Sequence, residues 1–161
     1  MSLNHIDGGN NPTMVDVSQK TIGKRTAHAR GIVRLPHEVW QELKEGDIHT
    51  KKGPIFHTAI IAGTMGAKKT HELIPFCHPL AMEACKIRLT VQEELLIIDC
   101  HVGLTGRTGV EMEALTGASI AALTVFDMAK AISHKIIIEQ IKLVEKTGGK
   151  RTMKDGDYVA K

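Results

Sequence analysis

Residues 82–104, "MEACKIRLTVQEELLIIDCHVGL", contain two runs in which apolar and polar side chains alternate. In the first run one face of the chain would carry Cys85, Ile87, Leu89 and Val91. In the second run the matching face would carry Leu96, Ile98, Cys100, Val102 and Leu104. A period of two residues is typical of a half-buried strand, and the polar "QEE" between the runs is typical of a turn. The stretch therefore predicts a β-hairpin with one face in the core.

The segments before this hairpin predict one strand and two helices. Residues 25–35 alternate in the same way and predict another half-buried strand. "LPHEVWQELKEG", residues 35–46, predicts a helix with Pro36 in its first turn and Gly46 at its end. Apolar residues at helical spacing predict a second helix over residues 54–70. Two glycines inside that helix would let another backbone come close.

The segments after the hairpin predict the longest helix and a last strand. Residues 110–132 contain no proline and carry an alanine-rich stripe at steps of three and four residues. Residues 135–146, "KIIIEQIKLVEK", are rich in β-branched side chains and predict a strand. The whole order predicts an α+β fold, a ferredoxin-like split βαβ plan with one added helix. Its antiparallel four-stranded sheet would carry helices on one face.

Length and composition indicate one domain that acts on a small anionic molecule. The chain has 161 residues, a formal charge of +3 and 3% aromatic residues. Few aromatic side chains and no long run of basic residues argue against a nucleic-acid partner. We expect a flexible arm over residues 1–13, a single catalytic domain over 14–147 and a flexible polar tail over 148–161.

The cysteine content and the hydropathy pattern predict a cytoplasmic protein that does not insert into a membrane. Three cysteines are an odd number, and the N-terminus lacks the apolar stretch of a signal peptide. The most apolar region is interrupted by Asp127 and Lys130. A membrane span needs about 18 apolar residues with few or no charges.

The stretch "LIPFCHPL", residues 73–80, places Cys77 beside His78. A zinc site needs three or four converging ligands, and the chain has no C-x-x-C or H-E-x-x-H motif. Neighbouring side chains of an extended segment point to opposite sides, so His78 cannot simply activate Cys77. Two interpretations remain: a buried Cys77 in a proline-bounded turn, or a substrate contact made by His78.

Three further groups of residues could take part in binding or catalysis. Lys51 and Lys52 lie on a Gly-Pro turn ahead of a predicted helix, where they could be solvated charge, an anion site or an acid/base group. The glycines around Arg107 precede the long helix but do not form a P-loop motif. Asp127 and Lys130 share one side of that helix and could form a surface salt bridge or, if partly buried, a proton-transfer pair.

The long helix also carries a second line of residues opposite its alanine stripe. This line consists of Glu113, Gly117, Ile120, Thr124 and Asp127, too few charges for a solvated face, so we expect it to touch another element or subunit. Glu113 and Asp127 are 14 positions apart, which is about 21 Å along an unbroken helix. If both contact the substrate, either the ligand is long or the pocket is assembled from two subunits. We therefore expect an oligomer with shared active sites.

Five motifs together resemble one known family. They are "MVDVS" (14–18), "KKGPIF" (51–56), "LIPFCHPL" (73–80), "TGVEMEALT" (108–116) and "DMAKA" (127–131). In this order and spacing they resemble the cyclic pyranopterin monophosphate synthase family, molybdenum cofactor biosynthesis protein C, over about residues 14–150. The resemblance implies a ferredoxin-like subunit in a homohexamer, a trimer of dimers with pockets at the dimer interface. It also implies conversion of 3′,8-cyclo-7,8-dihydro-GTP to cyclic pyranopterin monophosphate with release of diphosphate.

The resemblance also implies residue roles. The catalytic aspartate would be Asp127, with Lys52 and Lys130 as general acid/base lysines. The substrate-contact positions would be Phe76, Cys77, His78, Glu111, Met112 and Glu113. Arg25, Lys68 and Lys69 are weaker candidates for contact with the triphosphate. No cofactor is implied, although Mg²⁺ could accompany the triphosphate.

Two alternatives belong to other functional classes. The chain could be a non-catalytic nucleotide- or pterin-binding regulatory module, because ferredoxin-like folds often serve regulation. It could also be a metal-dependent hydrolase that uses its scattered histidines, although these show no ligand spacing.

Overall fold

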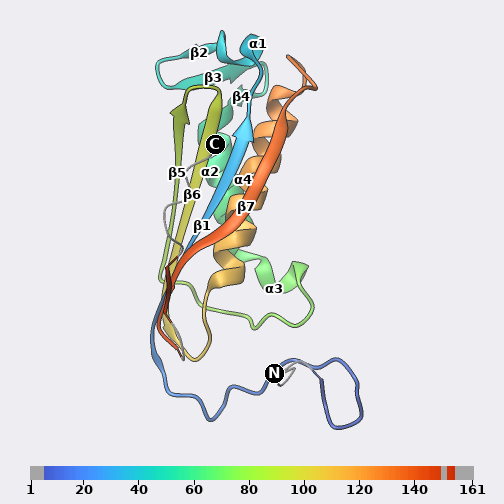
Figure 1. Ribbon diagram of the computed structural model, residues 1–161, viewed down its shortest axis with the longest axis vertical. Coiled ribbons are helices and arrows are strands. Elements are labelled where there is room, and N and C mark those ends of the chain that lie inside the picture. Colours follow the sequence, from blue (N-terminus) through green and yellow to red (C-terminus); the bar gives the residue numbers. More distant parts are fainter. Residues whose placement is uncertain (1–5, 150–151, 155–161) are drawn as a thin grey trace.

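A five-stranded antiparallel sheet in the order β5-β6-β1-β7-β8 forms the central layer of the protein (Figure 1). The computed structural model describes residues 6–149 and 152–154. The strands of this sheet are β1 (Gly23–Arg34), β5 (Ala84–Gln92), β6 (Leu95–Gly106), β7 (Ile137–Thr147) and β8 (Met153–Lys154). A second, three-stranded sheet contains β2 (Leu43–Lys44), β3 (Asp47–Thr50) and β4 (Gly53–Pro54). The protein is therefore α+β with antiparallel strand pairing.

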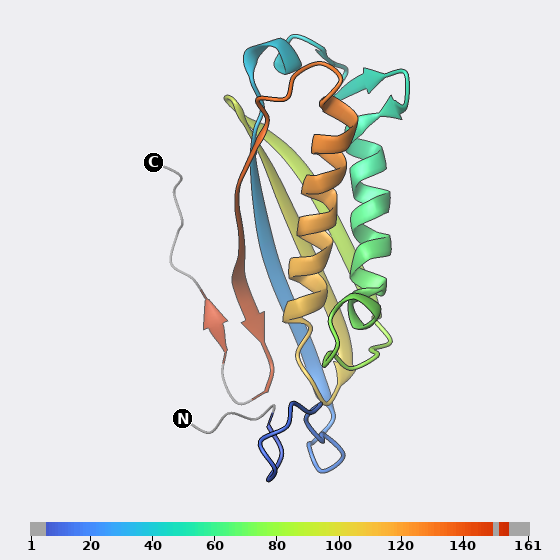
Figure 2. The same ribbon diagram turned by 90° about the vertical axis from the view of Figure 1, so that its right-hand side faces the viewer.

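Two long helices cover one face of the central sheet. The helices are α1 (His37–Trp40), α2 (Ile55–Lys68), α3 (Thr70–Leu73) and α4 (Glu111–Ala129). Figure 2 shows α2 and α4 side by side on the same face of the sheet. The core lies between these helices and the inward side chains of β1 and β6, among them Ala29, Val33, Leu96 and Ile98. Alternation in the sequence therefore placed one face of each strand in the core.

The predicted hairpin over residues 82–104 is confirmed. β5 and β6 pair without a register shift from Ala84 opposite Gly103 to Gln92 opposite Leu95. The turn consists of Glu93 and Glu94, and Glu93 has a φ of +54°. The inward side chains of β6 are buried, whereas β5 has no neighbour on its outer side and is more exposed.

The predicted helix over residues 35–46 is mostly wrong. α1 ends at Trp40, and the following residues form β2, which pairs with β3. Glu45 and Gly46, with φ angles of +52° and +83°, make a two-residue turn in which both positions have positive φ. Such a turn matches the twist of paired strands, so Gly46 closes a hairpin here and does not end a helix. Strands of two to four residues are too short to give a periodic signal.

Glycines let α2 and α4 approach closely, as the sequence predicted for the second helix. A Cβ atom on Gly63 would lie 2.7 Å from the carbonyl oxygen of Gly117 on α4 and 2.6 Å from Ile87 Cδ1. A Cβ atom on Gly117 would lie 2.7 Å from Cys100 Sγ. The second line of residues on α4 therefore packs partly against α2, which confirms that it touches another element.

Gly63→Ala is expected to lower the free energy of unfolding by about 1–3 kcal/mol, because the added methyl group meets backbone that cannot move aside cheaply. Urea denaturation measures this loss. Gly23→Ala is the matched control, because a Cβ atom on Gly23 has no neighbour within 4 Å. Equal stability of the two variants would contradict this account of the α2–α4 contact.

By length and composition α4 is the one helix among the described residues that could cross a membrane. It has 19 residues and a hydropathy of 1.2, and half of its most apolar window is buried inside the protein. The sequence predicted a helix over residues 110–132, and α4 covers Glu111–Ala129 with Asp127 inside it. A helix in the core of a globular protein has the same composition, so this feature is weak support for a membrane span.

The predicted arm and tail lie at the two ends of the described chain. Ile6 pairs with Pro12 in an isolated bridge within the arm, and Met153 and Lys154 of the tail form β8 beside β7. Residues 1–5, 150–151 and 155–161, which belong to the predicted arm and tail, lie outside the described residues.

Candidate functional site

Lys52, Asp127 and Lys130 come together at the C-terminal end of α4. Lys52 lies in the turn between β3 and β4, and its Nζ donates to Asp127 Oδ2 at 3.1 Å. Lys130 Nζ lies 2.6 Å from Asp127 Oδ1, so each carboxylate oxygen faces one ammonium group. Figure 1 shows β3 and β4 at the same end of the molecule as the C-terminal turns of α4. We call these three residues the charged cluster.

The charged cluster is exposed to solvent. The side chains of Lys52, Asp127 and Lys130 are 56%, 53% and 45% exposed, which fits the first of the two alternatives that the sequence left open for Asp127 and Lys130, a surface salt bridge. The hydrogen bond from Lys130, followed by that from Lys52, holds the pKa of Asp127 below its ordinary value. A carboxylate that stays ionised between two ammonium groups can orient both of them toward an anionic substrate and toward proton transfer.

A buried carboxyl group lies at the other end of α4. Glu113 is 4% exposed, and burial raises the pKa of its carboxyl group. The half-buried thiol of Cys77 also has a raised pKa, first because of burial and then because of the negative charge of Glu113. The segment of residues 73–80 therefore lies against the N-terminal turn of α4, where α3 and α4 also meet (Figure 1).

His78 binds the segment that precedes the first strand. Its Nε2 lies 2.8 Å from the carbonyl oxygen of Val15. Because a carbonyl oxygen only accepts, Nε2 of His78 carries the hydrogen in this contact. The fold thus brings the motif of residues 14–18 onto the motif of residues 73–80. We call Phe76, Cys77, His78, Met112 and Glu113 the pocket-wall residues, after the substrate-contact role that the family resemblance implies for them.

The outer pocket-wall residues and their neighbours differ in environment. Phe76 and Met112 are 40% and 39% exposed, which leaves apolar surface open to a ligand. Glu111 forms an ion pair with Lys146 at 2.6 Å. A ligand that reaches this end of α4 would therefore meet apolar surface beside a carboxylate that is already paired.

The candidates for triphosphate contact are less clearly placed. Arg25 is buried and donates to the carbonyl oxygens of Thr21 and Gly106 at 3.3 Å each. Lys68 is exposed at the last turn of α2, next to exposed Lys69. Within the described part of the chain, neither Arg25 nor Lys68 forms a hydrogen bond or ion pair with the charged cluster or the pocket-wall residues.

One chain therefore presents two half-sites and does not unite them. Glu113 and Asp127 both lie inside the unbroken helix α4, about 21 Å apart along its axis. The charged cluster can supply charge and proton transfer, whereas the pocket-wall residues offer a buried carboxyl group and exposed apolar surface. A compact ligand can contact both half-sites only if they come from different subunits.

Glu113→Gln is expected to stabilise the protein at neutral pH and to have no such effect in acid. Because burial raises the pKa of Glu113, the folded state keeps its proton to a higher pH than the unfolded state. The cost of ionising Glu113 therefore grows as the pH rises from its ordinary pKa of 4.5 to the higher folded value. Glutamine does not ionise. Thermal unfolding between pH 4 and pH 8 measures the difference in stability between Glu113→Gln and the wild type. A gain in stability that shrinks with rising pH would contradict this assignment. Glu42→Gln, at an exposed position, is the control.

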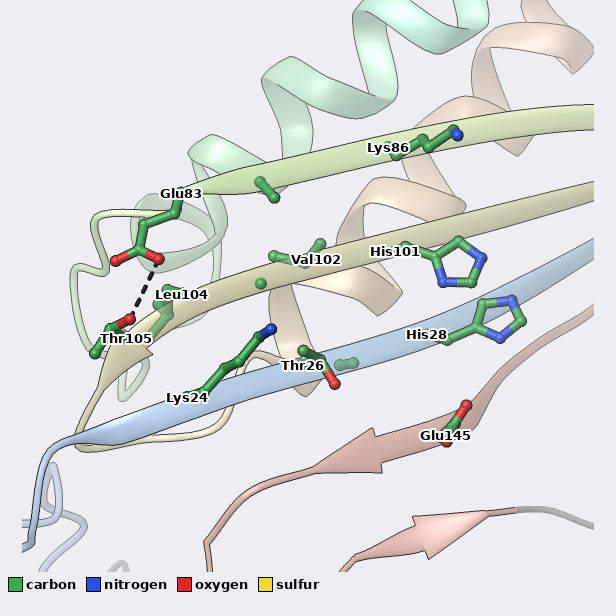
Figure 3. Close-up of a pocket in the computed structure, with 13 residues that line it drawn as sticks. Lys24, Thr26, His28, Glu83, Lys86, His101, Val102, Leu104, Thr105 and Glu145 are labelled. Atoms are coloured by element: carbon green, nitrogen blue, oxygen red, sulfur yellow. Dashed lines mark hydrogen bonds between the residues drawn. The ribbon is translucent and has the colours of Figure 1, made fainter.

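A separate cavity of about 650 Å³ lies on the sheet face opposite the helices (Figure 3). Lys24 and His28 of β1, Lys86 of β5, His101 of β6 and Glu145 of β7 are among its lining residues. The rings of His28 and His101 stack at 3.9 Å. None of the predicted site residues lines this cavity, and its positive and negative side chains are mixed. This cavity is therefore separate from both half-sites.

Metal-ligating side chains do not converge in the described part of the chain. Across residues 6–149 and 152–154, no group of three or more His, Cys, Asp or Glu side chains could hold a metal ion. Cys77, Cys85 and Cys100 are free thiols.

Sequence reasoning missed one buried carboxylate close to the charged cluster. Asp47 is 3% exposed and accepts hydrogen bonds from residues nine and ten positions further along the chain. Such a contact leaves no periodic or local capping signal. The only sign of this role in the sequence was the place of Asp47, a charged residue between Gly46 and Ile48 and shortly before the turn with Lys51 and Lys52.

Comparison of the whole sequence with known proteins finds the same family that the five motifs resemble. The MoaC family model matches residues 14–149. The chain is 53% identical over 150 residues to a cyclic pyranopterin monophosphate synthase of Xanthomonas axonopodis pv. citri (strain 306), covering 92% of this chain and 91% of that protein. It is 46% identical over 162 residues to a protein of the same name from Helicobacter hepaticus (strain ATCC 51449 / 3B1), covering 99% and 98% of the two chains.

A third relative shows the same domain inside a longer protein. The chain is 48% identical over 159 residues to molybdenum cofactor biosynthesis protein 1 of Dictyostelium discoideum, covering 88% of this chain and 25% of that protein. Identity of about half over most of the chain, together with a family model that spans both half-sites, is far beyond a resemblance of isolated motifs. The chain belongs to the MoaC family.

Proposed function

We propose that this protein is a cyclic pyranopterin monophosphate synthase of molybdenum cofactor biosynthesis. The substrate would be 3′,8-cyclo-7,8-dihydro-GTP, and the products would be cyclic pyranopterin monophosphate and diphosphate. The observation that carries the proposal is the contact of Lys52 and Lys130 with the two oxygens of Asp127, in a member of this family. A phosphorus–oxygen lyase that rearranges a purine needs proton donors and acceptors beside a phosphate chain.

The charged cluster suits the steps of this reaction. The former imidazole ring opens, the pterin ring closes, and an oxygen within the molecule attacks phosphorus as diphosphate leaves. Ring opening and ring closure move protons to and from nitrogen, which general acid/base lysines can perform. The ammonium groups of Lys52 and Lys130 can also stabilise charge that develops on the departing diphosphate. Asp127 would orient both amines and accept a proton in turn.

The pocket-wall residues suit recognition of the purine-derived rings. Glu113 can accept hydrogen bonds from the guanine-derived N–H groups, and its burial makes such a bond strong. Phe76 and Met112 offer apolar contact, while Cys77, His78 and Glu111 complete the substrate-contact set. We assign Lys68 to the triphosphate and Arg25 to a weaker role there, because Arg25 already donates to two backbone carbonyls.

We propose that each active site combines the charged cluster of one subunit with the pocket-wall residues of another. The separation of about 21 Å along α4 supports a site built from two chains, because one chain places its two half-sites at opposite ends of this helix. Exposed apolar side chains on the helical layer support an interface, among them Ile61, Met65 and Leu123, which are 62%, 55% and 55% exposed. We propose a homohexamer, a trimer of such dimers, as the assembled form.

We further infer a ferredoxin-like subunit in the cytoplasm, a single catalytic domain over residues 14–147. The order β5-β6-β1-β7 of the four long strands, with two helices on one face, supports the split βαβ plan. The three free thiols support a reducing compartment.

Turnover of the proposed substrate is the direct test. The full chain is incubated with 3′,8-cyclo-7,8-dihydro-GTP, diphosphate is assayed, and the organic product is identified by mass spectrometry. The expected result is stoichiometric diphosphate and a product with the mass of cyclic pyranopterin monophosphate. A ligand recovered unchanged after tight binding would overturn the proposal and indicate a regulatory module. A parallel reaction in chelator reports whether Mg²⁺ assists.

A further inference from the structure

Asp47 is a buried carboxylate whose two oxygens accept four hydrogen bonds. Its Oδ1 accepts from the backbone N–H groups of Ile48 and Phe56, each at 2.7 Å. Its Oδ2 accepts from the backbone N–H of His57 at 3.1 Å and from Nδ1 of the His57 ring at 2.7 Å. Burial alone would raise the pKa of Asp47, but these hydrogen bonds outweigh it and hold the pKa below its ordinary value. Asp47 is therefore an ionised group at the base of a loop.

These bonds replace the missing cap of α2. The residue before the helix is Pro54, which makes no side-chain cap, so the first N–H groups of α2 need an acceptor from elsewhere. Phe56 and His57 are the second and third residues of α2, the positions that an N-cap side chain normally serves. Asp47 serves them from nine and ten residues away in the sequence. The carboxylate also lies at the positive end of the helix dipole.

The same bonds close the loop that carries Lys52. Between Asp47 and Phe56 the chain forms β3, the turn with Lys52, and β4. Only two residue pairs join β3 to β4, His49 with Pro54 and Thr50 with Gly53. β3 also pairs with β2 through two residue pairs, so the hairpin of β3 and β4 lies at the edge of a small three-stranded sheet, and a hairpin this short is at best marginally stable by itself in water. The orientation of this hairpin therefore depends on the contacts at its two ends, and the hydrogen bonds of Asp47 join the start of β3 to the first turn of α2.

The position of Lys52 relative to Asp127 follows from this closure. Asp47 fixes the loop to the first turn of α2, α2 packs against α4 through Gly63 and Gly117, and α4 carries Asp127. The remaining direct link is the exposed ion pair between Lys52 and Asp127. An exposed ion pair contributes little to order by itself. A rigid path through Asp47 and α2 is needed to keep the amine in place.

We propose that Asp47 is a positioning residue that sets Lys52 against Asp127 for catalysis. This inference rests on the proposed function, in which Lys52 transfers a proton. Asp47 is 3% exposed and its two oxygens already accept four hydrogen bonds, so it would act through the loop and not by contact with the substrate. A shift of about 1 Å in a reacting group can lower a rate by about 100-fold, so loosening this loop should reduce turnover more than substrate binding.

Asp47→Asn in the full chain tests the proposal. The amide keeps the size of the carboxyl group but turns one acceptor into a donor, which then faces the N–H groups of His57. We expect kcat to fall about 10- to 100-fold while KM changes less than about threefold, because the pocket-wall residues are untouched. Amide hydrogen exchange without substrate should become faster in the peptide of residues 48–57 and stay unchanged in α4.

Two further variants separate positioning from general stability. Ile98→Val in the buried part of β6 removes a methyl group from the core and none of the hydrogen bonds to Asp47, and it should lower the unfolding midpoint with kcat unchanged. His57→Ala removes one of the four donors from a ring that is 77% exposed, so it leaves the fold intact and should lower kcat by about two- to fivefold. If Asp47→Asn does not fold, His57→Ala decides the question by the same two measurements.

The outcomes distinguish this inference from the proposed function. If the wild type turns over and both Asp47→Asn and His57→Ala keep full kcat, the positioning role is wrong. If exchange in residues 48–57 does not change, the closure of the loop by Asp47 is wrong. If the wild type does not convert the substrate, the proposed function fails, and the exchange measurement still reports whether Asp47 holds the loop.

Discussion

Asp127→Asn is expected to reduce kcat on the order of 10²- to 10⁴-fold, the usual contribution of a positioned acid/base group. Asparagine keeps the shape of the side chain but cannot face two ammonium groups with negative charge, nor take up a proton. The amines of Lys52 and Lys130, which now lie 3.1 Å and 2.6 Å from the carboxylate oxygens, would repel each other and separate. Steady-state release of diphosphate measures the loss.

Binding and folding should survive this substitution. Asp127 is 53% exposed, so its replacement removes no core contact, and the unfolding midpoint should change little. Lys52→Ala and Lys130→Ala should each cost a similar factor, and combining either with Asp127→Asn should cost little more, because the three residues act as a unit. Glu42→Gln is an exposed acidic control. Full turnover by Asp127→Asn would remove the charged cluster from the mechanism.

Co-expression of two inactive variants is expected to restore about one quarter of wild-type activity when one chain carries Asp127→Asn and the other Glu113→Gln. In a mixed dimer one shared site receives both substitutions, and the other receives an intact charged cluster and intact pocket-wall residues. Random pairing makes about half of the dimers mixed, with one of their two sites active. Each variant alone should be inactive or nearly so. Turnover of the total purified protein from the co-expression, compared with an equal amount of wild type, measures the recovery, and mixed dimers isolated with two different affinity tags should reach about one half.

A second pair of variants supplies the matched control. Asp127→Asn and Lys52→Ala damage the same charged cluster, whose members all come from one chain. No mixed dimer of these two variants contains an intact cluster, so co-expression should restore nothing. Recovery in both pairs would indicate an artefact of mixing. Recovery in neither pair would contradict the shared site and would require one chain to bridge the distance along α4.

Much of the central layer was predictable because its period is regular. The hairpin of β5 and β6, the first and last long strands and helices α2 and α4 follow from alternation or from helical spacing over nine or more residues. The region from Pro36 to Pro54 was not predictable in the same way. Its helical pattern was overridden by a turn at Glu45 and Gly46 and by pairing of very short strands. Local propensity is weak where the strands are this short.

The residues of the candidate site were predictable as types and not as neighbours. Asp127 and Lys130 share a helix face by spacing alone, but no spacing or local pattern says that Lys52, 75 positions before Asp127, reaches the same carboxylate, and only the family resemblance grouped the three residues. The contact of His78 with Val15 joins residues 63 positions apart. The sequence left open whether Asp127 and Lys130 are exposed or partly buried, because the apolar neighbours of a helical residue cannot be assigned to core or solvent until the position of the sheet is known.

The sequence by itself determined the class of the fold, the two long helices and the separation of Glu113 from Asp127, since these depend on chain period and on the fixed rise of a helix. Only the tertiary structure decided which charges meet, how exposed they are, and that Asp47 closes the Lys52 loop. Those facts depend on the packing of α2 against α4 and on hydrogen bonds between residues distant in the chain. Contacts of that kind are set by the shape of the whole core, which no local pattern of residues encodes.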